Sequence, residues 1–229
     1  MGKVITETLG PEWAEALGRE LSKEYMAQIA ARIVMLGNKV RPAVDYLFNA
    51  YRSTQPSQVK VVIVGQDPYP GNEAHGLAFS SRLQSIPPSL RVIFGELERS
   101  GYGKRTNPNL QDWADQGVFL LNSVLSTTYR ITNAHSSWGW QKFTQLTLRH
   151  LNTQGQDIVY MVWGGSALSV VEKSLDMRAS GDKSIVPARR LQLNACHPQA
   201  ENYGKKQFTG CNHFVMADHF LKDNAIKWV

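Results

Sequence analysis

The sequence contains few cysteines and lacks the common metal-binding and nucleotide-binding motifs. Cys196 and Cys211 are the only two cysteines among 229 residues, which is too few for a disulfide scaffold and favours a reducing environment. Neither Cys196-His197 nor the pair Cys211 and His213 has the CxxC or HExxH spacing of a zinc site. No P-loop and no GxGxxG fingerprint occurs. We therefore expect neither a metal nor a cofactor.

Long apolar runs and compositionally biased segments are also absent. No apolar run approaches the roughly 20 residues that a membrane span needs, and residues 1–20 carry polar groups throughout, unlike a secretory signal. No internal repeat and no linker rich in Gly, Pro or Ser divides the chain. These absences predict a single soluble domain over residues 1–229, in the cytoplasm and without a membrane partner. We expect a monomer.

Positive charge is in moderate excess. Lys and Arg together number 25 and Asp and Glu 19, which gives a formal net charge of +6 with neutral histidines. This balance favours an anionic partner, most simply a nucleic acid, but charge alone does not identify one.

Apolar runs alternate with helical patterns along the chain. Four apolar runs have the length of buried strands and lie at 59–64, 118–121, 158–163 and 191–196. Apolar residues with helical spacing predict four helices. The first contains Trp13, Leu17 and Leu21, the second follows Ser89 as its N-cap, the third lies around 138–151 and the fourth lies near the C-terminus. The alternation predicts an α/β fold with a central four-stranded, mainly parallel sheet flanked by helices on both faces.

Each predicted strand ends in polar or glycine-rich residues. The end of the first strand is the most informative, because the Asp67 carboxylate there is followed directly by the stiff segment Pro-Tyr-Pro at 68–70. Ligands bind beyond the carboxyl ends of parallel strands, so we expect these residues to meet in one cleft. In chain order the four ends are Gln66-Asp67, Asn122, Gly164-Gly165-Ser166 and His197.

The residue types suit recognition of a planar, amide-bearing ring and cleavage beside it. Asn122 offers one acceptor and two donors for a nucleobase edge, and Phe79 can stack on a base. Asp67 can position water or stabilise positive charge on a sugar, and His197 can hold or protonate a leaving oxygen. For Asn122, Asp67 and His197 taken singly, a strand-end cap, an Asx turn and a structural histidine are the better explanations, and core packing also explains Phe79. Their convergence favours an active site.

Several short motifs follow one another in a defined order. They are GQDPY at 65–69, AHGLAFS at 74–80, PPSL at 87–90, LLNSVL at 120–125, WGG at 163–165, His197-Pro198 and GCNHF at 210–214. With this series the chain resembles the family 1 uracil-DNA glycosylases, from the N-terminal helix to IKW at 226–228.

The resemblance implies an N-glycosyl hydrolase of base excision repair. Such an enzyme removes uracil from single- and double-stranded DNA, leaves an abasic site and needs no metal or cofactor. It implies that Asp67 positions water and stabilises the sugar cation, while His197 hydrogen-bonds the uracil oxygen. It further implies that Tyr69 blocks the thymine methyl group, Phe79 stacks on the base and Asn122 reads its edge.

The resemblance also implies residues that contact the base or the DNA backbone, and DNA-mimicking inhibitor proteins as further partners. Gln66 contributes backbone contacts to the base. The positions implied or inferred to contact DNA are Pro70, Ser89, Gly164, Gly165, Ser166, Gln199, Tyr203, Lys205 and Lys206.

Two departures from the family pattern concern DNA contacts. Pro70 stands where the family usually has His, and Glu201 stands where relatives place a leucine wedge that fills the vacated base stack. We hypothesise that Tyr203 supplies the wedge while Lys205 and Lys206 grip the backbone. The alternative is that Tyr203 packs on the protein. The departures would suit a divergent bacterial member, or a viral one acting in a host compartment that contains DNA.

Two other functions remain open from the sequence. One is a DNA-binding scaffold that serves replication, with weak or no glycosylase activity. The other is a glycosylase with broader base choice, against which Tyr69 and Asn122 argue, because they would exclude the thymine methyl group and mismatch cytosine.

Overall fold

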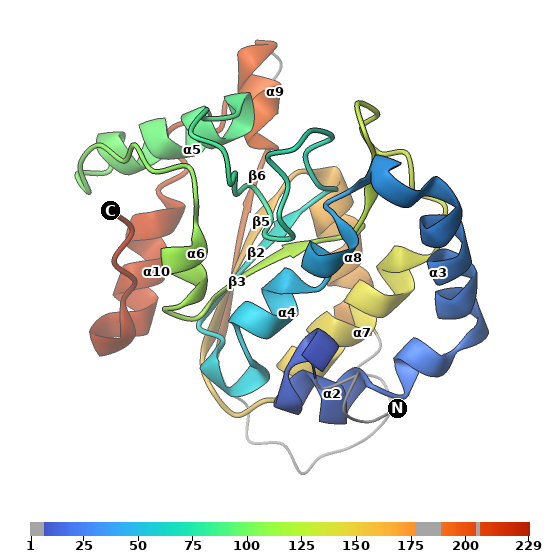
Figure 1. Cartoon of the computed structure of the whole chain (residues 1–229). Coiled ribbons are helices and arrows are strands. Elements are labelled where there is room, and N and C mark those ends of the chain that lie inside the picture. The colour runs from blue at the N-terminus through green and yellow to red at the C-terminus, as the bar shows by residue number, and fades with distance from the viewer. Residues whose placement is uncertain (1–6, 177–188, 205–206) are drawn as a thin grey trace.

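A sheet of four parallel strands runs through the middle of the molecule (Figure 1). The computed structural model describes residues 7–176, 189–204 and 207–229. The strand order is β3-β2-β5-β6, and every neighbouring pair is parallel. The predicted parallel sheet is therefore confirmed. Its strands are β2 (Val61–Gly65), β3 (Val118–Asn122), β5 (Ile158–Trp163) and β6 (Arg190–Ala195).

The two inner strands, β2 and β5, and the edge strand β3 are buried on both faces. Every residue of β2, β3 and β5 is buried, which explains why their sequences are continuous apolar runs rather than alternating ones. The edge strand β6 buries only Leu193 fully. Burial on both faces thus made the strands recognisable, and the predicted limits lie within two residues of the observed ones.

Helices cover both faces of the sheet, as predicted. In Figure 1, α7 (Trp140–Asn152) and α8 (Gly165–Asp176) lie on one side, and α10 (His213–Leu221) lies on the other with α5 (Pro88–Arg99) and α6 (Gln111–Ala114). None of the described helices is both long enough and apolar enough to cross a membrane.

Further elements complete the fold. Other helices are α2 (Pro11–Leu17), α3 (Glu24–Leu36), α4 (Asn49–Ser53) and α9 (Pro198–Asn202). β1 (Val40–Arg41) and β4 (Thr127–Thr128) form a short antiparallel pair. Short 3-10 turns lie at Glu20–Ser22, Gly37–Lys39, Val44–Tyr46, Pro56–Gln58 and Lys222–Asn224.

Two helix predictions are wrong in detail. The first helix ends at Leu17, so Leu21 lies in a separate 3-10 turn and packs on the core from there. Ser89 does not cap α5, because the helix already begins at Pro88 with Pro87 in the cap position. A proline suits the first helical turn because its fixed φ is already helical and its missing N–H is not needed.

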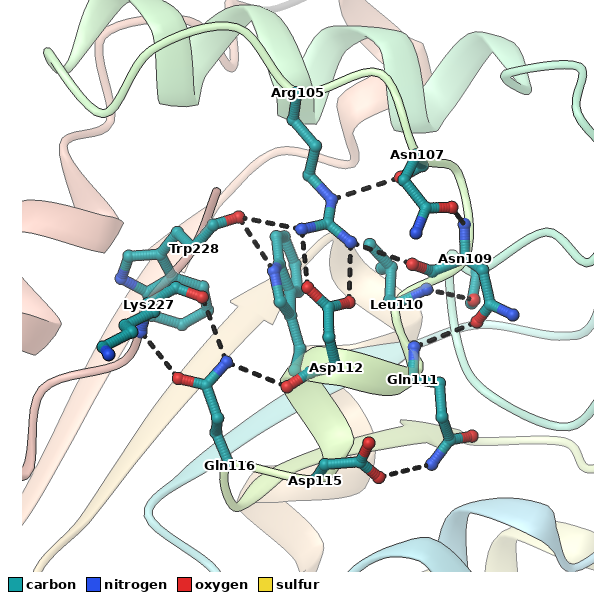
Figure 2. Close-up of polar contacts among 12 residues, drawn as sticks. Arg105, Asn107, Asn109, Leu110, Gln111, Asp112, Asp115, Gln116, Lys227 and Trp228 are labelled. Atoms are coloured by element: carbon teal, nitrogen blue, oxygen red, sulfur yellow. Dashed lines mark hydrogen bonds and ion pairs between the residues drawn. The ribbon is translucent and has the colours of Figure 1, made fainter.

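The C-terminal segment is fastened to α6, the helix that leads into β3 (Figure 2). The guanidinium of Arg105 forms a bidentate pair with Asp112 at 2.6 and 2.8 Å and also donates to the carbonyl of Trp228 at 3.2 Å. Trp113 Nε1 donates to the same carbonyl at 3.0 Å. Gln116 exchanges two hydrogen bonds with the backbone of Lys227. These contacts hold the start of β3, whose far end carries Asn122.

Candidate active site

A cavity of about 480 Å³ opens at the carboxyl ends of β2, β3 and β6. Three of the four predicted strand ends meet there, so the predicted convergence is confirmed for them. The predicted residues that line the cavity are Gln66, Asp67, Tyr69, Pro70, Phe79, Ser89, Asn122, His197, Gln199 and Tyr203.

The fourth strand end borders a neighbouring cavity of about 580 Å³. Gly165 and Ser166 line this second cavity, and Gln66 lines both. Ser166 Oγ lies 3.4 Å from Gln66 Oε1, which connects the two. Gly164 instead packs against His197, since a Cβ at this residue (φ +100°) would lie 3.0 Å from the His197 Cβ. Lys205 and Lys206 lie outside the described residues.

Asn122 lies beside a glycine that leaves room for its side chain. Gly65 and Asn122 are partners in the parallel register of β2 and β3, and a Cβ at Gly65 would lie 2.4 Å from Asn122 Oδ1. The Asn122 side chain is buried, and no residue in the described part of the chain hydrogen-bonds to it. Buried amides almost always have partners. The donors and acceptor of Asn122 are therefore available to a ligand in the cavity.

Phe79 forms part of an aromatic wall. Its ring lies 5.7 Å from the His197 ring and 5.4 Å from the Trp163 ring, measured between centroids. Its backbone has a φ of +62°, which is rare for a bulky side chain. Strained conformations of this kind persist where surrounding contacts enforce them, often at functional sites. Phe79 thus packs against the core and also presents itself to the cavity.

His197 is held as a neutral hydrogen-bond donor. It precedes α9, and its Nδ1 accepts the backbone N–H of Gln199 at 3.2 Å. Burial lowers the pKa of His197, so the neutral ring carries its proton on Nε2. A neutral imidazole with this tautomer can donate a hydrogen bond into the cavity.

Asp67 is partly removed from water. Burial raises its pKa, and the hydrogen bond from the Asn133 backbone N–H acts in the opposite direction. Asn133 was missed in the sequence because it comes from the loop after β4 and contributes a backbone group, which no side-chain pattern reveals. Among the described residues, no group of three or more His, Cys, Asp or Glu side chains could hold a metal.

Tyr69 is fixed at the cavity wall through its hydroxyl group. That group donates to the Phe79 carbonyl at 3.2 Å and lies 2.8 Å from Ser89 Oγ. Burial raises the pKa of Tyr69, so the ring stays neutral. Ser89, which is buried, therefore positions Tyr69 instead of capping α5.

Two further neighbours were not singled out in the sequence. His75 Nε2 lies 2.7 Å from Ser80 Oγ, and burial lowers the pKa of His75 to about 4, so this pair ties the lining loop together without charge. Arg130 donates its backbone N–H to the Pro70 carbonyl at 2.8 Å, and its side chain is exposed. The guanidinium of Arg130 lies over the Tyr129 ring, 5.1 Å from its centroid, and its place in a loop gave no signal of these contacts.

Replacing Asp67 with Asn should raise the free energy of unfolding at neutral pH. The raised pKa of Asp67 means that its ionisation costs the folded state more than the unfolded state. The gain should be present above the folded pKa and vanish as the pH falls below the unfolded value of about 4. Urea denaturation at neutral and acidic pH measures it, with the same substitution at the exposed Asp223 as control. Equal stability at neutral pH would contradict the prediction.

Comparisons with known proteins cover nearly the whole chain. The family model of the uracil DNA glycosylase superfamily matches residues 52–222. The chain is 38% identical to the uracil-DNA glycosylase of Agathobacter rectalis, over 96% of this chain and 95% of the relative. It is 35% identical to that of Haemophilus influenzae, over 94% and 96%.

Solved structures show the same fold. The crystal structure of mimivirus uracil-DNA glycosylase superposes with a TM-score of 0.82 at 24% identity, covering 100% of this chain and 89% of that one. A mimivirus Y322L variant in complex with UGI also gives 0.82, at 25% identity and with 100% and 90% covered. From the family match and the relatives, this chain belongs to the uracil DNA glycosylase superfamily.

Proposed function

We propose that this protein is a uracil-DNA glycosylase, which hydrolyses the N-glycosidic bond of deoxyuridine in DNA, releases uracil and leaves an abasic site. The observation that carries the proposal is the free amide of Asn122, which faces the same cavity as Asp67 and His197. Recognition and cleavage groups are thus in one place. The relatives that cover nearly the whole chain bear this name.

The size of the cavity implies that the base leaves the duplex. A cavity of about 480 Å³ cannot admit a whole duplex, so a base reaches Asn122 only after it leaves the helix. Extrusion costs a few kcal/mol and is easiest for weakly paired or single-stranded bases. In the extruded state, Asn122 would pair with the uracil edge, Phe79 would stack on its face, and Tyr69 would leave no room for a methyl group.

The chemistry separates charge between sugar and base. As the glycosidic bond breaks, its electron pair goes to the uracil ring and positive charge develops on the sugar. The Asp67 carboxylate stabilises that charge and orients a water molecule, which adds to the sugar carbon and passes a proton to the carboxylate; this proton then balances the one that the released uracil anion takes up. His197 donates from Nε2 to a uracil oxygen as negative charge develops there. One such preorganised donor typically contributes about 10²–10³-fold in rate.

Several finer properties belong to the same proposal. The enzyme would act as a monomer in the cytoplasm, or in a viral host compartment that contains DNA. Gly165 and Ser166 in the adjoining cavity would contact a backbone phosphate beside the extruded nucleotide. Inhibitor proteins that mimic DNA would compete for this surface. A mimivirus relative in complex with UGI supports that part of the proposal.

A uracil-release assay tests the function directly. We expect release from single-stranded and duplex oligonucleotides that contain uracil, and a loss of about 10²-fold or more in kcat for Asp67→Asn. The substituted enzyme should still bind DNA, because the change leaves the cavity shape intact. Tight DNA binding without uracil release by the native enzyme would favour the scaffold function. Comparable release of thymine from mismatches would favour broader base choice.

Tyr203 is the candidate wedge for the vacated stack. The residue is 66% exposed and lines the cavity, and its hydroxyl accepts from Gln199 Nε2 at 3.1 Å. This exposure argues against the alternative that Tyr203 packs on the protein. Stacking of an aromatic ring on a base contributes about 1–3 kcal/mol.

We expect Tyr203→Ala to slow release from duplex DNA roughly tenfold and release from single strands much less. The reason is that only a duplex leaves a gap for the ring to fill. Tyr203→Phe keeps the ring and is the matched control. Steady-state rates on both substrates measure the difference, and equal losses on the two would rule out a wedge.

A further inference from the structure

The Glu201 carboxylate is turned into the protein. Its Oε2 accepts the backbone N–H groups of Phe208 and Thr209, both at 2.6 Å, and its Oε1 accepts from Thr209 Oγ1 at 2.7 Å. Burial acts to raise the pKa of Glu201, but the hydrogen bonds from Thr209 and Phe208 outweigh it and lower that pKa. The side chain is therefore charged, and it accepts from three donors of two adjacent residues, two backbone N–H groups and one hydroxyl.

A second carboxylate fixes the same stretch from the other side. Glu96 in α5 is fully buried and accepts the backbone N–H groups of Gly210 at 2.7 Å and Asn212 at 2.8 Å. It also pairs with Arg99 at 2.7 Å. Burial alone would raise the pKa of Glu96, but these contacts lower it to about 2. The backbone at 208–212 is thus anchored to the body of the protein.

The Glu201 contacts tie the end of α9 to the body of the protein. Glu201 lies in the last turn of α9, and its carboxylate joins that turn to Phe208 and Thr209. Holding the end of the helix in this way reduces its conformational freedom before it meets a ligand. Tyr203 is the C-cap residue of α9, two residues after Glu201, and it is exposed. A second tie comes from Gln199, whose side chain reaches Tyr203 and whose backbone N–H reaches His197.

The chemistry of the side chain excludes a role for Glu201 inside the base stack. A carboxylate among stacked bases would lose hydration and face the negative phosphates. In this structure its oxygens instead satisfy backbone donors that would otherwise lack partners. Phe208 is buried, so losing this acceptor would leave its N–H unsatisfied, which is costly.

We propose that Glu201 is a positioning residue for excision from duplex DNA: its carboxylate ties the end of α9 to Phe208 and Thr209 and so presents Tyr203, the C-cap residue of α9, to the gap that the extruded base leaves. This inference rests on the proposed function. It assigns Glu201 no contact with the uracil or the sugar.

The test compares kcat/KM for uracil release from duplex and single-stranded DNA of one sequence. Three variants separate the possible roles: Glu201→Gln removes the charge and half of the acceptors, Glu201→Asp keeps the charge but shortens the reach, and Glu201→Leu offers an apolar wedge. We expect each variant to lower kcat/KM on duplex DNA about tenfold and kcat/KM on single-stranded DNA less than twofold. Glu98→Gln, at an exposed position of α5, is the control and should change neither.

A double-mutant cycle connects Glu201 with Tyr203. If the carboxylate acts by placing the ring, Tyr203→Ala should cost little more on duplex DNA once Glu201→Gln is present, because the two losses are then not additive. Thermal unfolding of every variant verifies that the protein remains folded, and amide exchange at Phe208 and Thr209 should accelerate in all three Glu201 variants.

Each other outcome overturns the proposal. Faster duplex release by Glu201→Leu would place residue 201 itself in the stack. If Glu201→Asp released uracil from duplex DNA as fast as the native enzyme, the negative charge at residue 201 would suffice and the reach of the side chain would have no role. Equal losses on both substrates would indicate a general structural role, and additive losses in the cycle would separate Glu201 from Tyr203. Failure of the native enzyme to release uracil even from single strands would instead refute the proposed function.

Discussion

The site depends on the close approach of Asn122 to the end of β2, which Gly65 permits. Parallel pairing places Gly65 opposite Asn122, and the missing Cβ leaves space for the amide. Backbone hydrogen bonds continue past the strand ends, since Ser123 donates to Gly65 at 2.9 Å and Val124 donates to Gln66 at 3.0 Å. These bonds fix the chain on both sides of the cavity. A base-reading amide and the Asp67 carboxylate therefore share one rigid wall.

Burial determines which groups in the cavity carry charge. It lowers the pKa of His197 and keeps the ring a neutral donor, whereas it raises the pKa of Asp67 and makes the carboxylate costly. A carboxylate that is poorly solvated is stabilised strongly when positive charge develops beside it, as it does on the sugar during cleavage. The surrounding helices contribute geometry: Ser89 holds Tyr69, and Glu201 fixes the end of α9, where the proposed wedge lies.

The sequence predicted the sheet and most of the cavity because both follow from local patterns. Strands buried on two faces are continuous apolar runs, and parallel strands bring their carboxyl ends together. The contact between Asn133 and Asp67 was not predictable, because it joins a loop backbone to a residue 66 positions away. Glu201 was recognised only as a poor wedge, since its partners are backbone groups. Gly164 was assigned to DNA contact, whereas its visible role is packing against His197.

Uracil release from single-stranded DNA by the Gly65→Ala variant tests most directly whether Gly65 makes room for the base-reading amide of Asn122. The added methyl group would overlap Asn122 Oδ1, so the amide must turn away from the base edge. We expect kcat/KM to fall at least tenfold, in line with about 1–3 kcal/mol for a bidentate base contact, while the protein stays folded. Gly95→Ala, in α5 with no atom within 4 Å of the added Cβ, should remain fully active. Native activity of Gly65→Ala would contradict the account.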